Sequence, residues 1–211
     1  MKLFVIGANG RTGRQILDLA RARGHQVTAF VRSPDKLAEI SGIDVARGDP
    51  RQAGAMAAAM AGHDAVLSAI GPHPRDALLR PTTLLGDCAR ATVDAMRAVG
   101  VGRLAIVSAA VLFPEKGLDF VFFRWLLRHH ARDLRAMEQI VRESGLAWTI
   151  ARPPRLTHAE DTSFVALQDA LPAGRRVMSF RSVAAFLLDA VERQSHVAEV
   201  VGLARGLAVA S

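Results

Sequence analysis

The residues best suited to binding a ligand stand near the start of the chain, in the run Gly7-Ala8-Asn9-Gly10-Arg11-Thr12-Gly13. Three glycines at this spacing, after an apolar strand and before a helix, form a loop that holds a pyrophosphate. Gly7 allows a tight turn, Gly10 allows the backbone to approach the phosphates, and Gly13 allows the helix to pack on the sheet. The N–H groups that open the helix point at the phosphates. We therefore predict a dinucleotide site that includes Asn9, Arg11 and Thr12; an ordinary strand-to-helix turn is the alternative.

The end of the second expected strand indicates which dinucleotide binds. This strand is followed by Arg32-Ser33, with Lys36 close behind. Proteins that bind NAD usually carry an acidic residue here, which bonds the ribose 2′-hydroxyl. Arg32, Ser33 and Arg11 instead suit the 2′-phosphate of NADP, because a guanidinium offers two parallel donors to a phosphate. The sequence therefore predicts NADP(H), and a solvated surface charge is the alternative interpretation of Arg32.

Further cofactor contacts are predicted at the ends of the later strands, because ligands of such sheets bind at the carboxyl ends of the strands. Asp49 follows the third strand and is expected to accept a hydrogen bond from the adenine amino group. The run Ser68-Ala69-Ile70-Gly71 follows the fourth strand and is expected beside the nicotinamide ribose. Pro153 follows the sixth strand, where its backbone would border the carboxamide. Plain loop structure is the alternative for each of these positions.

Two residues are candidates for catalysis. Ser108 ends the fifth strand, where its hydroxyl would bond a substrate carbonyl or the nicotinamide carboxamide. His130 lies in a long helix, and an imidazole near the nicotinamide can donate a proton. The alternatives are a solvated loop serine and a surface histidine on an arginine-rich helix. Asp133 and Glu138, in the same helix, are expected to be surface charges that pair with its arginines.

Strands and helices must hold these residues in place. Predicted strands and helices alternate regularly along the chain, and this alternation predicts an α/β fold. We expect a Rossmann-type, doubly wound, mostly parallel sheet with helices on both faces and a small C-terminal substrate cap after Pro153. Residues 1–211 are expected to form a single NAD(P)-binding Rossmann domain. Strands are predicted at residues 3–6, 26–31, 43–46, 65–69, 104–107, 148–151 and 199–203, with a weaker one at 177–180. Helices are predicted at residues 11–23, 34–39, 51–60, 84–99, 120–144 and 181–193.

Composition narrows the classes of partner. The net charge is +7, but the basic residues are spread along the chain and aromatic residues are few, which does not favour a nucleic-acid groove. The most apolar stretch, residues 118–127, carries charges and is too short to span a membrane. The histidines are too scattered for a metal site. Cys88 is the only cysteine, which excludes an intrachain disulfide and fits a cytoplasmic protein. A monomer or a homodimer is expected.

These residues together resemble the atypical branch of the short-chain dehydrogenase/reductase superfamily, in particular its biliverdin/flavin-reductase-like and nitrogen-metabolite-repressor-like members. The resemblance covers nearly the whole chain. It rests on the glycine loop, on Val31-Arg32-Ser33, on Gly48-Asp49, on residues 144–154 and on residues 180–184. It implies a Rossmann-type fold, an NADP cofactor and cofactor contacts at the positions named above.

The resemblance carries no catalytic group over to this chain. Typical short-chain dehydrogenases donate a proton from a tyrosine made acidic by a lysine four residues later, and this chain contains no tyrosine. Biliverdin/flavin reductases are similar in lacking that dyad. We therefore predict an NADPH-dependent reductase that passes hydride directly to a small, flat conjugated acceptor, a flavin or quinone. A non-enzymatic NADP(H)-binding redox sensor or regulatory protein is the alternative. An epimerase of nucleotide-linked sugars would need an acid–base pair that we do not find.

Overall fold

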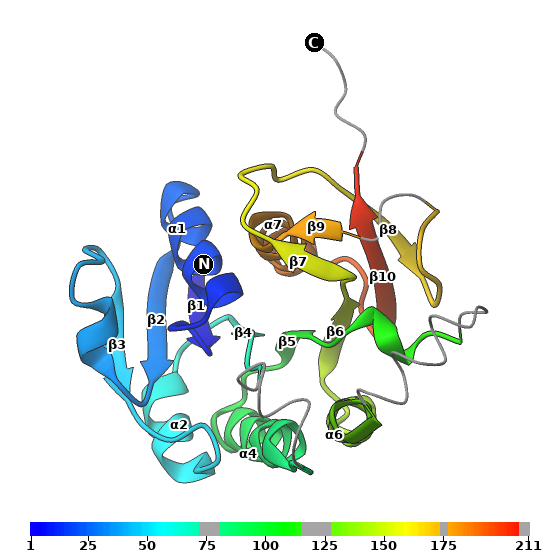
Figure 1. The fold of residues 1–211 in the computed structure, drawn as a ribbon. Helices are drawn as coiled ribbons and strands as arrows, with labels where there is room; N and C mark the ends of the chain where they lie inside the picture. Colours follow the sequence, from blue (N-terminus) through cyan, green and yellow to red (C-terminus); the bar gives the residue numbers. More distant parts are fainter. Residues whose placement is uncertain (72–80, 115–127, 174–176, 207–211) are drawn as a thin grey trace.

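The computed structural model describes residues 1–71, 81–114, 128–173 and 177–206. Its centre is an eight-stranded sheet in the order β3-β2-β1-β4-β5-β6-β10-β8 (Figure 1). All neighbouring strands pair in parallel except the edge strand β8, which is antiparallel to β10. The strands are β1 (Lys2–Ile6), β2 (Gln26–Val31), β3 (Asp44–Arg47), β4 (Ala65–Ser68), β5 (Arg103–Val107), β6 (Ala147–Arg152), β8 (Phe164–Gln168) and β10 (Glu199–Arg205). The predicted Rossmann-type α/β fold is confirmed.

Helices cover both faces of this sheet. Helices α1 (Arg11–Ala22) and α7 (Phe180–Glu192) lie together on one face. Helices α2 (Ala53–Met60), α4 (Leu84–Val99) and α6 (Arg128–Arg142) lie on the other (Figure 1). Two short 3₁₀ helices, η1 (Pro34–Leu37) and η2 (Ala110–Leu112), follow β2 and β5.

The central strand β1 shows why the sequence forms this arrangement. Leu3, Phe4, Val5 and Ile6 are all fully buried. Successive side chains of a strand point to opposite faces, so a strand covered on both faces needs an unbroken apolar run. Leu3 and Val5 pack in the core beneath α1 and α7, whereas Phe4 and Ile6 pack in the core beneath α2, α4 and α6. This packing on both faces holds β1 in the middle of the fold. The glycine loop begins where β1 ends, at the carboxyl edge of the sheet.

The C-terminal part of the chain departs from the predicted elements. The expected strand at 177–180 is β9 (Val177–Ser179), which pairs with β7 (Arg155–Thr157) in a separate two-stranded sheet. Neither β7 nor β8 is predicted from the sequence. Much of the segment after Pro153 extends the main sheet or covers it as α7, so the small cap consists of β7 and β9.

Two helices also differ from their predicted ranges. Residues 34–37 form the 3₁₀ helix η1 in place of an α-helix over 34–39, with Pro34 at its start. The helix expected at 120–144 is described from Arg128 to Arg142; residues 120–127 lie outside the described residues. The glycines at 24, 62, 100 and 145 have φ between 69° and 77°, the left-handed conformation that ends many helices.

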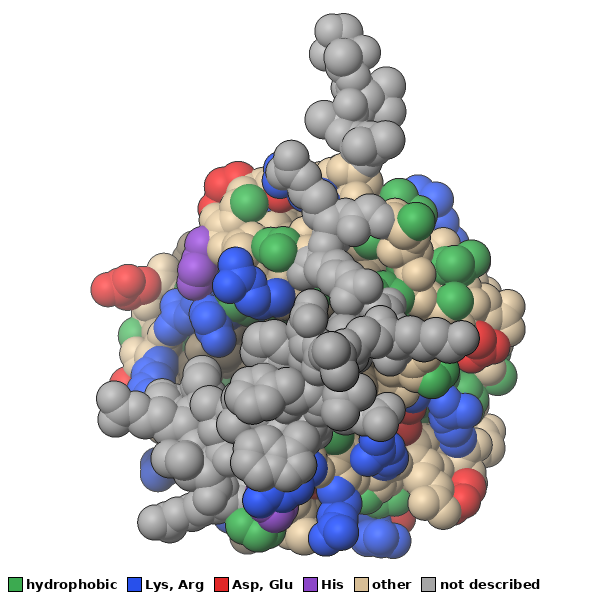
Figure 2. All heavy atoms as spheres, turned by 45° about the vertical axis from the view of Figure 1, so that its right-hand side comes forward, with side chains coloured by type: hydrophobic (Ala, Val, Ile, Leu, Met, Phe, Trp, Pro, Cys, Tyr) green, Lys and Arg blue, Asp and Glu red, His purple; other side chains and the backbone are tan. Residues whose placement is uncertain are grey.

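The surface of the described residues is relevant to contact with membranes and nucleic acids. Within residues 1–71, 81–114, 128–173 and 177–206, no helix combines the length and the apolar character needed to cross a membrane. On the face shown in Figure 2, lysine and arginine side chains lie in several separate groups.

Candidate functional site

The glycine loop closes tightly on the end of β4. Gly7 has φ +80°, and a Cβ added to it would lie 2.8 Å from the carbonyl carbon of Ala69. A Cβ on Gly13 would lie only 2.2 Å from the carbonyl oxygen of Gly7. The Gly10 N–H donates to that same oxygen at 2.9 Å. Gly7 therefore makes the turn and Gly13 lets α1 pack against it, as the sequence predicts.

The loop brings the N-terminus of α1 to the carboxyl edge of the sheet. Gly10 is the N-cap, and it has no side chain that could satisfy the first N–H groups of the helix. The N–H groups of Arg11, Thr12 and Gly13 precede the first intrahelical bond, which Arg14 donates to the Gly10 carbonyl. This end of the helix, with its positive dipole, suits a pyrophosphate.

A cavity of about 220 Å³ lies beside the loop. The cavity is lined by the glycine loop, by the end of β2, by the segments that follow β2, β3 and β4, and by the first residue of α4. Its lining residues are Gly7, Asn9, Gly10, Phe30, Val31, Arg32, Ser33, Lys36, Asp49, Pro50, Arg51, Ala69, Ile70, Gly71 and Leu84. The structure thus brings together most of the cofactor residues named from the sequence. It adds Phe30, Val31, Lys36, Pro50, Arg51 and Leu84 to them.

Asn9 leaves a hydrogen-bond acceptor at this cavity. Its side-chain amide donates to the Ser33 carbonyl at 3.0 Å, which ties the glycine loop to the end of β2. Its Oδ1 atom is buried and has no hydrogen-bond partner among the described residues. Buried acceptors are almost always paired in native proteins. An unpaired acceptor on a residue that lines this cavity fits a bound ligand that donates a hydrogen bond, such as a ribose hydroxyl.

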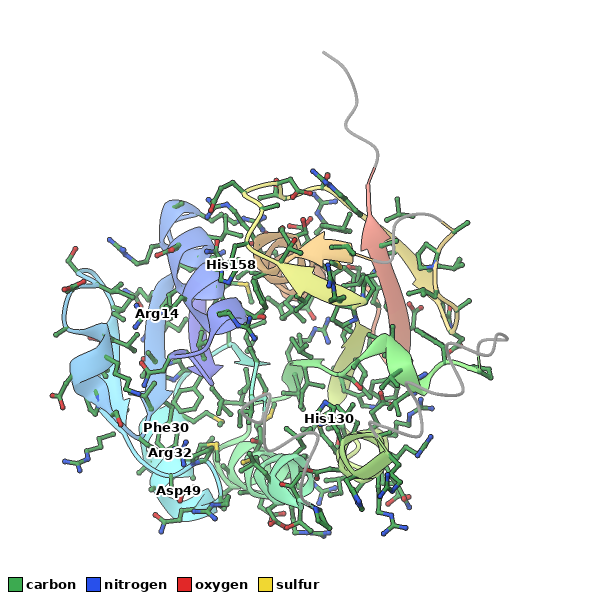
Figure 3. The ribbon with its side chains drawn as sticks, in the orientation of Figure 1. Arg14, Phe30, Arg32, Asp49, His130 and His158 are labelled. Atoms are coloured by element: carbon green, nitrogen blue, oxygen red, sulfur yellow. The ribbon has the colours of Figure 1, made fainter. Side chains whose placement is uncertain are left out.

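The cations at the end of β2 differ in part from the expected set. Arg32 and Lys36 are exposed and line the cavity. Arg11 does not line it; the Arg11 guanidinium lies 4.6 Å from the centre of the Phe180 ring, at the start of α7. Arg14 approaches from α1 instead and donates to the Lys36 carbonyl at 2.5 Å (Figure 3). Arg32 and Lys36 are therefore the cations that the end of β2 and the turn after it bring to the cavity.

Asp49 is bound by a neighbour that the sequence analysis passed over. Its carboxylate accepts hydrogen bonds from the backbone and the guanidinium of Arg51. These bonds, from the side chain first and then from the backbone, lower the pKa of Asp49 to about 2. Asp49 is therefore a carboxylate across the ordinary pH range, and Arg51 occupies much of its accepting capacity. The spacing Asp49-Pro50-Arg51 was the signal available in the sequence.

Four other predicted contacts lie behind the cavity wall or away from it. Thr12, Gly13 and Ser68 are buried and do not line the cavity. Pro153 is also buried, and its carbonyl accepts a hydrogen bond from the Ala110 N–H at 2.9 Å. That bond joins the segments that follow β5 and β6.

Ser108 belongs to a buried ionic network. Its hydroxyl donates to Glu138 at 2.6 Å. Glu138 also accepts two hydrogen bonds from Arg152, at 2.8 and 2.6 Å, in a bidentate pair. The Arg152 guanidinium in turn lies 4.7 Å from the centre of the Phe113 ring. While this network is intact, the Ser108 proton is not available to a substrate carbonyl, and the hydroxyl oxygen can only accept.

The prediction that Asp133 and Glu138 are surface charges is wrong. Their residues are 2% and 3% exposed. Asp133 accepts hydrogen bonds from the N–H groups of Leu85 and Gly86 and so caps α4 from the neighbouring helix. Both acids share a face of α6 with the buried Leu134, Met137 and Val141. Their helical spacing to these apolar residues was the signal in the sequence, because positions three or four apart share one face.

His130 lies in the first turn of α6 and is partly buried (Figure 3). Its Nδ1 atom is buried without a hydrogen-bond partner among the described residues. Burial lowers the pKa of His130, although the charge of Asp133 acts in the opposite direction. The imidazole is therefore favoured in its neutral form. His130 does not line the cavity beside the glycine loop.

Neither a reactive cysteine nor a metal cluster is found among the described residues. Burial, as the largest cause, raises the pKa of Cys88 to about 12, which makes the thiol unreactive. In the part of the chain that the structure describes, no three His, Cys, Asp or Glu side chains are grouped to hold a metal ion.

Comparison with known proteins identifies the family. Residues 7–194 match the model of a family described as NAD(P)H-binding. The chain belongs to this NAD(P)H-binding family. The match spans the glycine loop, the cavity and the buried Ser108 network. Membership confirms the predicted binding of a nicotinamide dinucleotide.

Relatives of this NAD(P)H-binding protein carry different functional names. The uncharacterized sugar epimerase YhfK of Bacillus subtilis is 27% identical over 181 residues, covering 82% of this chain and 81% of YhfK. The NAD(P)H azoreductase of Xenophilus azovorans is 26% identical over 153 residues, which cover 72% of this chain and 47% of the azoreductase. A Streptococcus pneumoniae protein provisionally named an NADH-flavin reductase has a similar fold. Its TM-score is 0.76 at 22% identity, covering 98% of this chain and all of that one. Together with the family, the name of the azoreductase supports an NAD(P)H-dependent oxidoreductase.

Proposed function

We propose that this NAD(P)H-binding protein is an NADPH-dependent reductase that passes hydride directly to a flat conjugated acceptor, a flavin or a quinone. The observation that carries the cofactor choice is the pair of exposed cations, Arg32 and Lys36, at the cavity. An acidic residue at the end of β2 would favour the 2′-hydroxyl of NAD, whereas a guanidinium and an ammonium favour a 2′-phosphate. The names of the azoreductase and flavin-reductase relatives support conjugated acceptors.

The residues of this chain fit the cofactor in two places. The first turn of α1 would hold the pyrophosphate, and the cavity beside it would hold the adenosine half, with Asn9 Oδ1 accepting from a ribose hydroxyl. Arg32, Ser33 and Lys36 would hold the 2′-phosphate. When bound, the nicotinamide supplies the hydride. Gly7, Gly10, Ala69, Ile70 and Gly71 would form the remaining contacts, most of them through the backbone.

The protein's own part in the reaction is positioning. Ser108 would accept a hydrogen bond from the ligand near the nicotinamide, since its own proton is donated to Glu138. His130, favoured as neutral imidazole, would donate or accept a hydrogen bond beside the acceptor. A flavin or quinone takes its proton from solvent after reduction, so a dedicated strong acid is not needed. Orientation and exclusion of water would supply most of the rate enhancement.

The redox sensor remains the second candidate because of Ser108. This serine is 6% exposed and its hydroxyl is bonded to a buried ion pair. A protein that binds NADP(H) and turns nothing over needs no accessible group at this position. The sensor would bind the cofactor through the same residues and transmit its oxidation state to a partner.

Steady-state kinetics with Arg32→Ala test the proposal. Wild-type protein should oxidise NADPH only when a flavin or quinone is present. Arg32→Ala should raise the KM for NADPH by about 10- to 100-fold, because a charge-assisted hydrogen bond to phosphate contributes about 1.5–3 kcal/mol. The same variant should leave the KM for NADH unchanged.

Arg90→Ala is the matched control, because Arg90 is an exposed arginine of α4 outside the cavity. It should behave as wild type with both cofactors. Equal kinetics of the Arg32 and Arg90 variants would contradict the assignment of the 2′-phosphate site.

A further inference from the structure

The segment after β3 holds an arginine in a fixed position at the cavity. Arg51 donates its backbone N–H and its Nε–H to Oδ1 of Asp49, each at 3.0 Å. Its Nη2 donates to Oδ2 of Asp49 at 2.5 Å. A guanidinium held at two points by one carboxylate lies in a defined plane. The Arg51 side chain is 55% exposed, so it is held in place while remaining accessible to a ligand.

Asp49 is poorly placed to bind adenine itself. A carboxylate offers about four acceptor positions, and Arg51 takes three of them. The Asp49 side chain is 25% exposed, less than half as much as that of Arg51. A donor from the adenine ring would have to share oxygens that already accept from a charged group. Arg51 is the more accessible member of the pair.

The lining of the cavity suits a flat ring against Arg51. Ile70, Leu84 and Val31 contribute apolar surface to the same cavity. Arginine stacks its planar group on aromatic rings, and the adenine base offers such a ring. The ion pair with Asp49 also offsets the charge of Arg51. Arg51 therefore adds less to the attraction of a 2′-phosphate than Arg32 or Lys36.

We propose that the face of the Arg51 guanidinium binds the adenine ring, and that Asp49 is a positioning residue that fixes Arg51. This inference rests on the proposed cofactor site and assigns separate roles to two of its arginines. Arg32 distinguishes NADPH from NADH through the 2′-phosphate. Arg51 contributes equally to the binding of both cofactors, because both carry the same adenine.

Calorimetric titration with NADPH and with NADH tests this division. Arg51→Ala should weaken the binding of both cofactors by the same factor, about tenfold. Arg51→Lys should behave like Arg51→Ala, because lysine keeps the charge but has no planar face. Asp49→Asn should weaken both cofactors to a smaller extent. Added to Arg51→Ala, it should cause no further loss, since a positioning residue acts only through the residue it positions.

Three outcomes would overturn the inference. Loss in Asp49→Asn with normal binding in Arg51→Ala would make Asp49 the direct adenine ligand. Selective loss of NADPH in Arg51→Ala would assign Arg51 to the 2′-phosphate, and full rescue by Arg51→Lys would show that charge suffices. The Arg32→Ala variant, measured beside them, tests the proposed function separately: it should lose affinity for NADPH alone. Thermal unfolding of each variant confirms that the fold is retained.

Discussion

The hydroxyl of Ser108 donates to a carboxylate oxygen of Glu138 at 2.6 Å, and this contact joins the end of β5 to α6. Arg152 extends it to the end of β6 through a bidentate ion pair with the same carboxylate. Ser108 directly follows β5 and Arg152 ends β6, at the carboxyl edge of the sheet where ligands of such folds bind. Through these hydrogen bonds, the buried Glu138 connects α6 to the ends of β5 and β6.

Loss of the Glu138 carboxylate should destabilise the protein strongly. Glu138→Ala leaves Arg152, whose side chain is only 12% exposed, without its anionic partner. Removal of one member of a buried ion pair costs about 3–5 kcal/mol. Urea unfolding should show this loss, and Glu143→Ala, an exposed acid of the following turn, should change stability by less than about 0.5 kcal/mol. Equal stability of the two variants would show that the network contributes nothing.

Asp133 should stabilise the protein as a cap supplied from another helix. Its oxygens accept from the N–H groups of Leu85 and Gly86, and the N-cap residue Thr83 provides no side-chain cap. Asp133→Ala should lower the free energy of unfolding by about 1–3 kcal/mol, because buried N–H groups would lose their acceptor. Asp94→Ala, an exposed aspartate of α4, is the control in the same thermal unfolding series. An unchanged midpoint for Asp133→Ala would contradict the capping role.

Two glycine-to-alanine substitutions, one in the glycine loop and one in α2, should differ in their effects on stability and on NADPH binding. In Gly13→Ala the new methyl group would clash with the Gly7 carbonyl oxygen, 2.2 Å away, so the loop must shift. We expect a loss of about 1–3 kcal/mol in stability, as for other overpacked sites, together with weaker NADPH binding. Gly54→Ala in α2 meets nothing within 4 Å and should be neutral or slightly stabilising. Calorimetry measures the stability of both variants, and titration measures their binding of NADPH. Normal NADPH binding by Gly13→Ala would contradict this prediction.

Acidification should weaken the contact between the ends of α1 and α7. Burial alone would raise the pKa of Glu192, but hydrogen bonds from His25 and Arg23 outweigh it and hold the pKa below its ordinary value of 4.5. A carboxyl with a lowered folded-state pKa stabilises the fold above its unfolded-state pKa, and this stabilisation is lost as the pH falls through the folded-state pKa.

The corresponding measurement compares wild type with Glu192→Gln in urea from neutral pH down to about pH 3. Wild type should be the more stable at neutral pH, and the difference should shrink on acidification. Glu160→Gln, an exposed acid, should show no such difference. A difference between wild type and Glu192→Gln that stays constant with pH would contradict the ion pair.

Much of the fold follows from local patterns, and the exceptions have physical reasons. The sequence predicts the helix Leu84–Val99 with the bounds that the structure has, because its apolar periodicity is strong and Gly100 ends it. Strand β7 has only three residues, and the pairing of β7 and β8 with β9 and β10 depends on contacts distant in sequence. No local pattern marks such strands.

In the candidate site, too, some residues are recognisable from the local sequence, whereas the roles of others depend on partners far away in the chain. The glycine loop and Arg32 are recognisable because their spacing has a mechanical meaning. The roles of Glu138 and Arg51 depend on their partners. Glu138 meets Arg152 and Ser108 from other elements, so residue type alone suggests a surface charge. Arg11 was expected at the 2′-phosphate, but its side chain turns to Phe180 of α7, a contact between residues far apart in the chain.

The rate at which the wild-type protein oxidises NADPH in the presence of flavins and quinones tests the central claim most directly. NADPH deuterated at the transferred position should be compared with ordinary NADPH. A reductase with direct hydride transfer should consume NADPH at a rate that rises with acceptor concentration and falls on deuteration. If the protein binds NADPH tightly but leaves it unoxidised with every flavin and quinone, the reductase proposal is contradicted and the redox sensor is favoured.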